Sequence, residues 1–295
     1  MSPRLFSWGQ RTYIMGVLNM TPDSFSGDGM LGVDDPVIAA LERAHQFVQD
    51  GVDILDIGGE STRPGAQPVP AEVEIERVVP IVRALAASGI PAVISVDTSK
   101  AEVAAAALHA GAHWINDVWG LRADAGMAEV VARGNATIVL MHNRLKPNSA
   151  ELQERLGGRY VGVQYTDLLG EVKAELLESV ALAHQAAIPD EHIILDPGIG
   201  FGKTVAQSLE LLDRLPELRS LGYPLLIGPS RKSFIGYTLD LPPDQRIEGT
   251  AAAVAVGITR GADIIRVHDL PAMLRVARMT DAIVRRSQAE AAGPS

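Results

Sequence analysis

Short apolar runs recur along the chain and alternate with longer stretches that carry apolar residues at helical spacing. The runs occupy residues 13–18, 52–57, 90–96, 112–115, 135–141, 192–195, 223–227 and 262–267. Six of them directly follow a glycine: Gly51, Gly89, Gly111, Gly134, Gly222 and Gly261. Glycine just past a helix end supplies a left-handed cap, and unbroken apolar runs are typical of strands buried on both faces. The pattern predicts eight parallel strands.

The stretches between the runs predict helices. Apolar residues line one stripe between Val37 and Val48, and Asp34-Asp35-Pro36 is a typical helix start. A stripe from Ile75 to Leu85 contains Pro80, which we expect to kink that helix or to shift its start. Further stripes run through residues 172–183 and 270–277.

Alternating strands and helices predict a parallel α/β fold. The 295 residues shared among eight units give about 37 residues each, which suits a (β/α)8 TIM barrel of roughly 250 residues with a few long loops. A doubly wound open sheet is the alternative. No linker-like composition divides the chain, so we expect a single domain over 1–295. Within it, 146–164 forms a long excursion after the fifth strand, and 286–295 forms a frayed tail.

Composition and charge narrow the function. The net charge is −10, which argues against nucleic acid or an anionic membrane as a partner bound by bulk charge. Cysteine is absent, so disulfides, thiolate metal sites and cysteine nucleophiles are excluded. No apolar stretch approaches the ~18 residues of a membrane span, and the start of the chain does not resemble a targeting signal. We expect a cytoplasmic protein.

Polar residues stand at the carboxyl end of every expected strand, where α/β enzymes place their chemistry. One set is rich in carboxylates and amides: Asp97, Asn116 and Asp196. These groups fit a flat heterocycle with N–H and NH₂ donors, and Lys232 would balance their charge and donate to a ring carbonyl. The alternative for each aspartate is a helix N-cap, since each precedes an expected helix.

A second set of residues suits an anion. Arg63, Arg266 and His268 are donors for phosphate, and Asn19 offers an oxygen that could share Mg²⁺ with a phosphate. Residues 230–233 predict the start of a short helix, whose first N–H groups also attract anions. Arg266 could instead pair with a nearby aspartate, Asp263 or Asp269, and His268 could be a core or capping histidine.

The segment 198–204 ends in Gly-Lys-Thr like a phosphate-binding P-loop. That motif requires glycine five positions before Gly202, where this chain has Pro197. We therefore expect the glycine-rich turn to let the backbone pass close to a ligand instead.

Eight segments together resemble the dihydropteroate synthase family and occur in its order over nearly the whole chain. They are MGVLNMTPDSFS (15–26), DILDIGGESTRPGA (53–66), SVDTSK (95–100), INDVWG (115–120), LMHN (140–143), LDPGIGFGKT (195–204), GPSRKSFIG (228–236) and RVHD (266–269). The resemblance implies a TIM barrel that condenses 6-hydroxymethyl-7,8-dihydropterin diphosphate with 4-aminobenzoate. It also implies Mg²⁺ as cofactor, a homodimer formed through the later helices, and inhibition by sulfonamides.

The resemblance assigns roles residue by residue. Asn19 would hold Mg²⁺, and the pterin would be held by Asp97, Asn116, Asp196 and Lys232. The diphosphate would be contacted by Asn19, Thr62, Arg266 and His268, with Arg63 near by, and Val267 would be a further substrate-binding residue. The aminobenzoate would meet Ser233 and a pocket that includes Phe25 and Phe201. Catalysis would fall to Asp97, Lys232, Arg266 and His268, and the loops 19–31 and 60–69 would act as lids.

One departure concerns the first lid, where the family commonly reads Ser-Phe-Ser-Asp-Gly. This chain has Gly27 before Asp28, so the acid comes one place later and its closing role is in doubt. Two other functions compete with the synthase. One is a pterin-binding barrel that transfers a methyl group from tetrahydrofolate to a corrinoid, which would not use the anion site. The other is a paralogue that binds pterin without catalysis.

Overall fold

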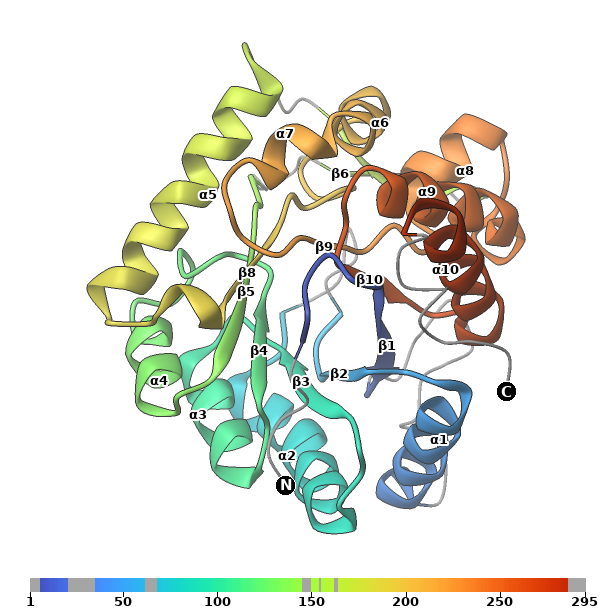
Figure 1. The fold of residues 1–295 in the computed structure, drawn as a ribbon. Coiled ribbons are helices and arrows are strands. Elements are labelled where there is room, and N and C mark those ends of the chain that lie inside the picture. The colour runs from blue at the N-terminus through green and yellow to red at the C-terminus, as the bar shows by residue number, and fades with distance from the viewer. Residues whose placement is uncertain are drawn as a thin grey trace.

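The computed structural model describes residues 6–20, 35–61, 68–144, 150–153, 155–161 and 164–285. Within them, parallel strands form an inner ring and helices an outer one (Figure 1). The strands of this ring are β1 (Tyr13–Asn19), β2 (Ile54–Gly58), β3 (Val93–Asp97), β4 (Trp114–Asp117), β5 (Thr137–Met141), β8 (Ile193–Asp196), β9 (Leu226–Ile227) and β10 (Ile264–Val267).

The ring is a nearly closed barrel. Hydrogen-bonded neighbours follow the order β8-β5-β4-β3-β2-β1-β10-β9, and a parallel bridge between Leu195 and Leu225 joins the two end strands. The predicted TIM barrel is confirmed, and the open sheet is wrong. Each apolar run overlaps its strand, but several strands begin later than the run does, because its first residues form the turn that follows the helix cap, and several, such as β1 and β4, end beyond it.

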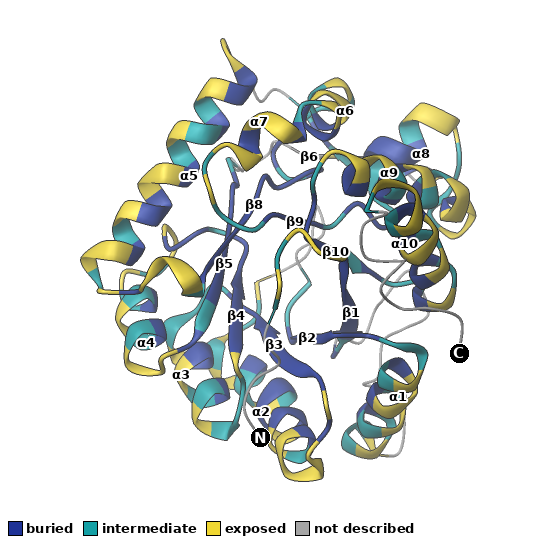
Figure 2. Ribbon diagram, in the orientation of Figure 1, coloured by how far each residue is buried: buried dark blue, intermediate teal, exposed yellow. Residues whose placement is uncertain are grey.

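The helices cover the outside of the barrel and bury one face each (Figure 2). They are α1 (Pro36–Asp50), α2 (Ala71–Ser88), α3 (Ala101–Ala110), α4 (Met127–Arg133), α5 (Leu168–Gln185), α6 (Val205–Asp213), α7 (Leu215–Arg219), α8 (Ser233–Leu239), α9 (Ile247–Thr259) and α10 (Leu270–Val284). Single 3₁₀ turns lie at Asp190–His192 and Pro243–Gln245. Asp35 caps α1 by accepting from the N–H of Val37 and of Ile38.

The structure adds detail to two expectations about local structure. Helix α2 begins at Ala71 and continues through Pro80, which lies on the exposed side. The carbonyl that proline leaves without an intrahelical donor therefore faces water. The excursion at 146–164 contains an antiparallel hairpin, β6 (Ala150–Gln153) with β7 (Gly157–Tyr160), whose turn is held by a bond from Arg246 Nη2 to the Leu156 carbonyl (2.9 Å).

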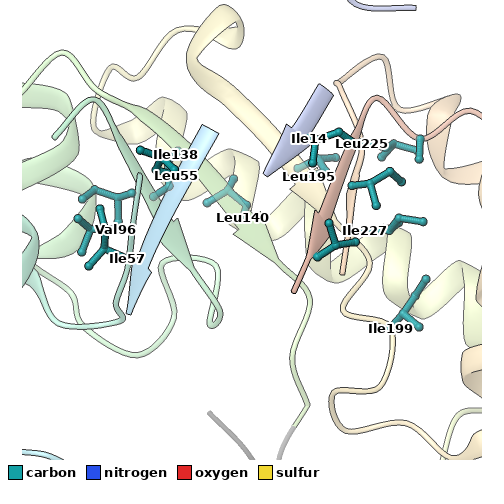
Figure 3. Close-up of a cluster of buried hydrophobic side chains, with 14 of the residues drawn as sticks. Ile14, Leu55, Ile57, Val96, Ile138, Leu140, Leu195, Ile199, Leu225 and Ile227 are labelled. Carbon is teal, nitrogen blue, oxygen red and sulfur yellow. The ribbon is translucent and has the colours of Figure 1, made fainter. Parts of the chain in front are cut away.

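Two apolar layers hold the strands. Alternate strand residues point outward and pack under the helices, among them Leu55, Ile57, Ile138, Leu140 and Leu195 (Figure 3). The residues between them point into the barrel, because side chains alternate along a strand. They form an apolar floor of Tyr13, Met15, Ile54, Val93, Trp114, Val139, Ile194, Leu226 and Ile264, with Phe6 and Trp8 packed against it. Every residue of this floor is apolar or aromatic, so a polar site inside the barrel is expected above it.

Candidate active site

A ring of polar side chains lies directly above the apolar floor. On five strands, the residue two positions after the floor residue is polar. These residues are Asp56 on β2, Ser95 on β3, Asn116 on β4, Asp196 on β8 and Arg266 on β10. The period of two along a strand turns these side chains inward, toward the carboxyl end of the barrel. The next layer along β1 and β3 contains Asn19 and Asp97, which the register places on either side of Gly58. The strand register thus gathers residues that are far apart in the sequence.

Arg266 connects the acidic side chains of this ring. Its Nε lies 2.6 Å from Asp56 Oδ2, and its Nη2 lies 2.8 Å from Asp97 Oδ2. The alternative pairing of Arg266 with Asp263 or Asp269 is wrong. Asp263 faces the far end of the barrel and pairs with Arg219, and Asp269 pairs with Arg231.

Asp56 is a member of the ring to which the sequence analysis assigned no role, as is its partner Ser95. It is fully buried and accepts from Ser95 Oγ (2.6 Å) and Asn116 Nδ2 (3.1 Å) as well as from Arg266. It therefore orients one residue from the predicted pterin set and one from the predicted phosphate set. An ionisable residue inside an otherwise apolar strand was the signal, because such a group needs buried partners.

Asp97 and Asp196 do not cap helices. Helix α3 begins after Lys100, and α6 is capped by Thr204, which forms a reciprocal capping box with Gln207. The Asp196 carboxylate accepts from the N–H of Gly198 (2.7 Å). Burial raises the pKa of Asp196 to about 6, although that hydrogen bond and the nearby Lys232 lower it. Burial likewise raises the pKa of Asp97, against the attraction of Arg266. Both carboxyls are thus desolvated and suited to partners that donate N–H groups.

Lys232 lies at the same mouth, in the loop between β9 and α8. Its ammonium stands 3.5 Å from the centre of the Phe201 ring, a cation–π contact, and its charge acts on both Asp97 and Asp196. As predicted, a short helix opens here, because α8 begins at Ser233 directly after Lys232. Arg246 Nη1 donates to the Arg231 carbonyl (2.9 Å) and so holds the turn that precedes α8.

His268 lies at the end of β10 beside the loop that follows β9. Its Nδ1 is 3.1 Å from Ser230 Oγ, and its N–H donates to the same oxygen (3.2 Å). Its neighbour Val267 is fully buried in the outer layer under the helices, so the Val267 side chain does not line the mouth. The guanidinium of the neighbouring Arg231 is bound to the Asp269 carboxylate.

Of the remaining predicted site residues, one lies at the mouth and the others lie outside the described residues. Asn19 is half-buried at the rim, and its Oδ1 would lie 4.0 Å from a Cβ placed on Gly58, as would Oδ2 of Asp97. Phe25, Thr62 and Arg63, most of both proposed lid loops, the Gly27-Asp28 change and the tail 286–295 lie outside the described residues.

The chemistry of the Asn19 environment bears on the expected Mg²⁺. In the described ranges, no cluster of three or more His, Asp or Glu is arranged to hold a metal ion by itself. Magnesium commonly takes one or two protein oxygens and completes its shell with phosphate oxygens and water. A single amide oxygen at the rim fits a metal that arrives with a diphosphate.

Known proteins of similar sequence and structure agree with this site. Residues 15–268 match the family described as pterin binding enzyme. Dihydropteroate synthase of Clostridium beijerinckii is 47% identical over 283 residues, which cover 95% of this chain and 97% of the relative. The crystal structure of the Clostridium difficile dihydropteroate synthase in the presence of pteroic acid has a TM-score of 0.84 at 45% identity, covering 95% and 100% of the two chains. That of the Xanthomonas albilineans enzyme with 4-aminobenzoic acid has a TM-score of 0.81 at 40% identity, covering 92% and 93%.

The barrel, its polar mouth and these matches define the class: the chain belongs to the pterin-binding enzyme family. Within that family it stands among the dihydropteroate synthases, which are transferases of folate synthesis.

Proposed function

We propose that this protein joins 6-hydroxymethyl-7,8-dihydropterin diphosphate to 4-aminobenzoate and releases diphosphate, giving 7,8-dihydropteroate. The observation that carries the proposal is one barrel mouth that holds three acidic or amide side chains of the pterin set together with two cations. Arg266 bonded to Asp97 at 2.8 Å and Lys232 acting on Asp196 bring the two sets within one site. The relatives crystallised with pteroic acid and with 4-aminobenzoic acid support the same substrates.

The pterin ring would occupy the space bounded by Asp97, Asn116 and Asp196. Its N–H and NH₂ groups would donate to the two carboxylates, and the Asn116 amide can both donate and accept. Lys232 would donate to the ring carbonyl. The raised pKa of each aspartate would fall when these donors bind, because they favour the charged form.

The diphosphate would leave toward the cationic side of the mouth. The bond between the pterin methylene carbon and the phosphate oxygen breaks, and its electron pair departs with the diphosphate. Arg266 and His268 would stabilise the charge that develops on the leaving group, and the Asp97 carboxylate would stabilise the cation left at the methylene. The amine nitrogen of aminobenzoate then bonds to that carbon and loses a proton. No nucleophile of the enzyme is required.

Asn19 would hold Mg²⁺, which when bound would neutralise charge on the diphosphate oxygens. Phe201 and the first turn of α8 at Ser233 would contact the aminobenzoate, and Phe25 would complete that pocket. Thr62 and Arg63 would reach the diphosphate from their loop. Sulfonamides, as analogues of aminobenzoate, would compete for the same pocket.

Homodimer formation through α9 and α10 is part of the proposal. Large apolar side chains are exposed on these helices, and they include Met279, Val256 and Val284. Association would remove them from water. No helix among the described residues is long and apolar enough to cross a bilayer, and we propose that the enzyme works in the cytoplasm.

The test is a reconstituted assay with purified protein, dihydropterin diphosphate, 4-aminobenzoate and Mg²⁺. We expect dihydropteroate and diphosphate in equal amounts, and no product when aminobenzoate is omitted. An enzyme that transfers methyl groups from a folate would release no diphosphate, and a pterin-binding protein without catalysis would bind the substrate but leave it intact. Either result would refute the proposal.

A further inference from the structure

A buried lysine lies beneath the glycine-rich turn that follows β8. Lys203 is only 2% exposed. Its Nζ donates to the carbonyls of Gly198 and Phe201 (both 3.0 Å) and lies 2.9 Å from Nδ1 of His142. An ammonium has three N–H donors, and these three acceptors are neutral. Burying a charge against neutral partners is unfavourable, and burial lowers the pKa of Lys203 to about 7. The residue therefore stabilises a particular loop conformation rather than an ion pair.

The same turn holds two groups of the proposed pterin site. At its start, the N–H of Gly198 donates to the Asp196 carboxylate (2.7 Å). Gly198 has a φ of +68°, and a Cβ there would lie 1.9 Å from the His142 carbonyl oxygen, so the turn is pressed against the end of β5. At its far side, the Phe201 ring covers the Lys232 ammonium at 3.5 Å. The two carbonyls bound by Lys203 thus belong to the residues that contact Asp196 and Lys232.

His142 links Lys203 to the outer helix α5. Burial and the positive charge of Lys203 together lower the pKa of His142 to about 4, although Glu175 raises it. The imidazole is therefore neutral near pH 7, and Nδ1 can accept from Lys203. The other nitrogen, Nε2, lies 3.1 Å from Glu175 Oε2, and Glu175 is also bound by Arg144 Nε (2.8 Å). The lysine is thus anchored to the rigid outer layer.

We propose that Lys203 is a positioning residue for the pterin substrate, which holds the 198–202 turn so that Asp196 and the Phe201–Lys232 pair are in place before binding. It does not touch substrate itself. The proposal rests on the proposed function, because the same site must bind pterin diphosphate. It also accounts for the Gly-Lys-Thr sequence without a P-loop, since this lysine points at carbonyls of its own turn.

The experiment compares Lys203→Met with Lys173→Met, which removes the same charge from the outside of α5. Binding of dihydropterin diphosphate with Mg²⁺ is measured by calorimetry at a temperature where circular dichroism shows every protein folded. We expect Lys203→Met to weaken binding about 10- to 100-fold, as a displaced turn would, and Lys173→Met to bind like the unmodified protein. Unchanged affinity in Lys203→Met overturns the inference. Failure of the unmodified protein to bind would instead refute the proposed function.

A double-variant cycle tests whether the lysine acts through its turn. Phe201→Ala is measured alone and together with Lys203→Met. We expect losses of affinity that do not add, because both changes release the same contact with Lys232; fully additive losses would overturn the inference. If Lys203→Met does not fold, Lys203→Gln takes its place, since its amide keeps two N–H donors without the charge. Two N–H donors cannot serve the three acceptors of Lys203, so affinity in Lys203→Gln equal to that of the unmodified protein would overturn the inference.

Discussion

Replacing Asp56 by asparagine separates the function of the polar ring from its contribution to stability. Asp56 accepts hydrogen bonds from Ser95, Asn116 and Arg266 at 2.6–3.1 Å and is fully buried. Asparagine has one acceptor oxygen and an NH₂ group, so at least one of these donors meets another donor. Removing one partner of a buried ion pair destabilises a protein by about 3–5 kcal/mol. We expect the low end, about 3 kcal/mol, because Arg266 keeps Asp97 and remains 20% exposed.

The effect on binding is expected to be separate. Asn116 and Arg266 lose their common anchor, and pterin diphosphate affinity should fall at least about tenfold, equivalent to about 1.4 kcal/mol. Urea unfolding measures the first effect and calorimetry the second. The matched control is Asp53→Asn. Asp53 precedes the same strand at the far end of the barrel, is 2% exposed, and pairs with Arg11.

The two variants should lose stability to a similar extent, but only Asp56→Asn should lose affinity. Equal losses of affinity in Asp56→Asn and Asp53→Asn would mean that pterin binding depends on the overall stability of the barrel and not on Asp56 in particular. Normal affinity in Asp56→Asn would mean that Asn116 and Arg266 are oriented by other groups. Either result would refute the reasoning.

Three further predictions concern the protonation of Asp196, the role of His268 at the diphosphate, and Mg²⁺. The pKa of Asp196 rises from 3.8 to about 6 on folding, so its contribution to stability falls as pH rises through that window. Asp196→Asn should therefore gain up to about 3 kcal/mol relative to the unmodified protein between pH 4 and 7 in urea unfolding; a constant difference would contradict this. His268→Ala should lower turnover about 100-fold while the melting temperature changes little, because the imidazole is only half-buried at the mouth and is not part of the apolar core; equal losses would point to a core histidine. EDTA should abolish turnover but leave binding of the dihydropterin alcohol unchanged, and loss of that binding would argue for a metal that holds the ring.

The sequence predicted the barrel well, because each strand lies in a predominantly apolar run and each strand end carries polar residues. It also indicated which strand ends meet, since parallel strands share one carboxyl edge. The pairing within that edge could not be predicted. Arg266 has aspartates three residues to either side, yet it binds Asp56, which is 210 residues away in the chain. Local spacing favours near neighbours, whereas the barrel places β10 next to β1 and one strand away from β2.

The sequence also did not show which residues of each strand point into the barrel. Arg266 and His268 face the mouth, so alternation sends Val267 outward into the layer under the helices. The Arg-Val-His motif lists these residues consecutively and does not show that the middle side chain points the other way. The role suggested for Lys203 was equally hidden, because its acceptors are backbone carbonyls, and a sequence gives no sign of where a carbonyl points.

A crystal structure of this protein with dihydropterin diphosphate and Mg²⁺ tests the central claim most directly. We expect the ring within hydrogen-bond distance of Asp97, Asn116 and Asp196, the Lys232 ammonium at its carbonyl, and the diphosphate beside Arg266 and His268. A pterin bound elsewhere, or a ring turned so that its donors face away from both aspartates, would contradict the account.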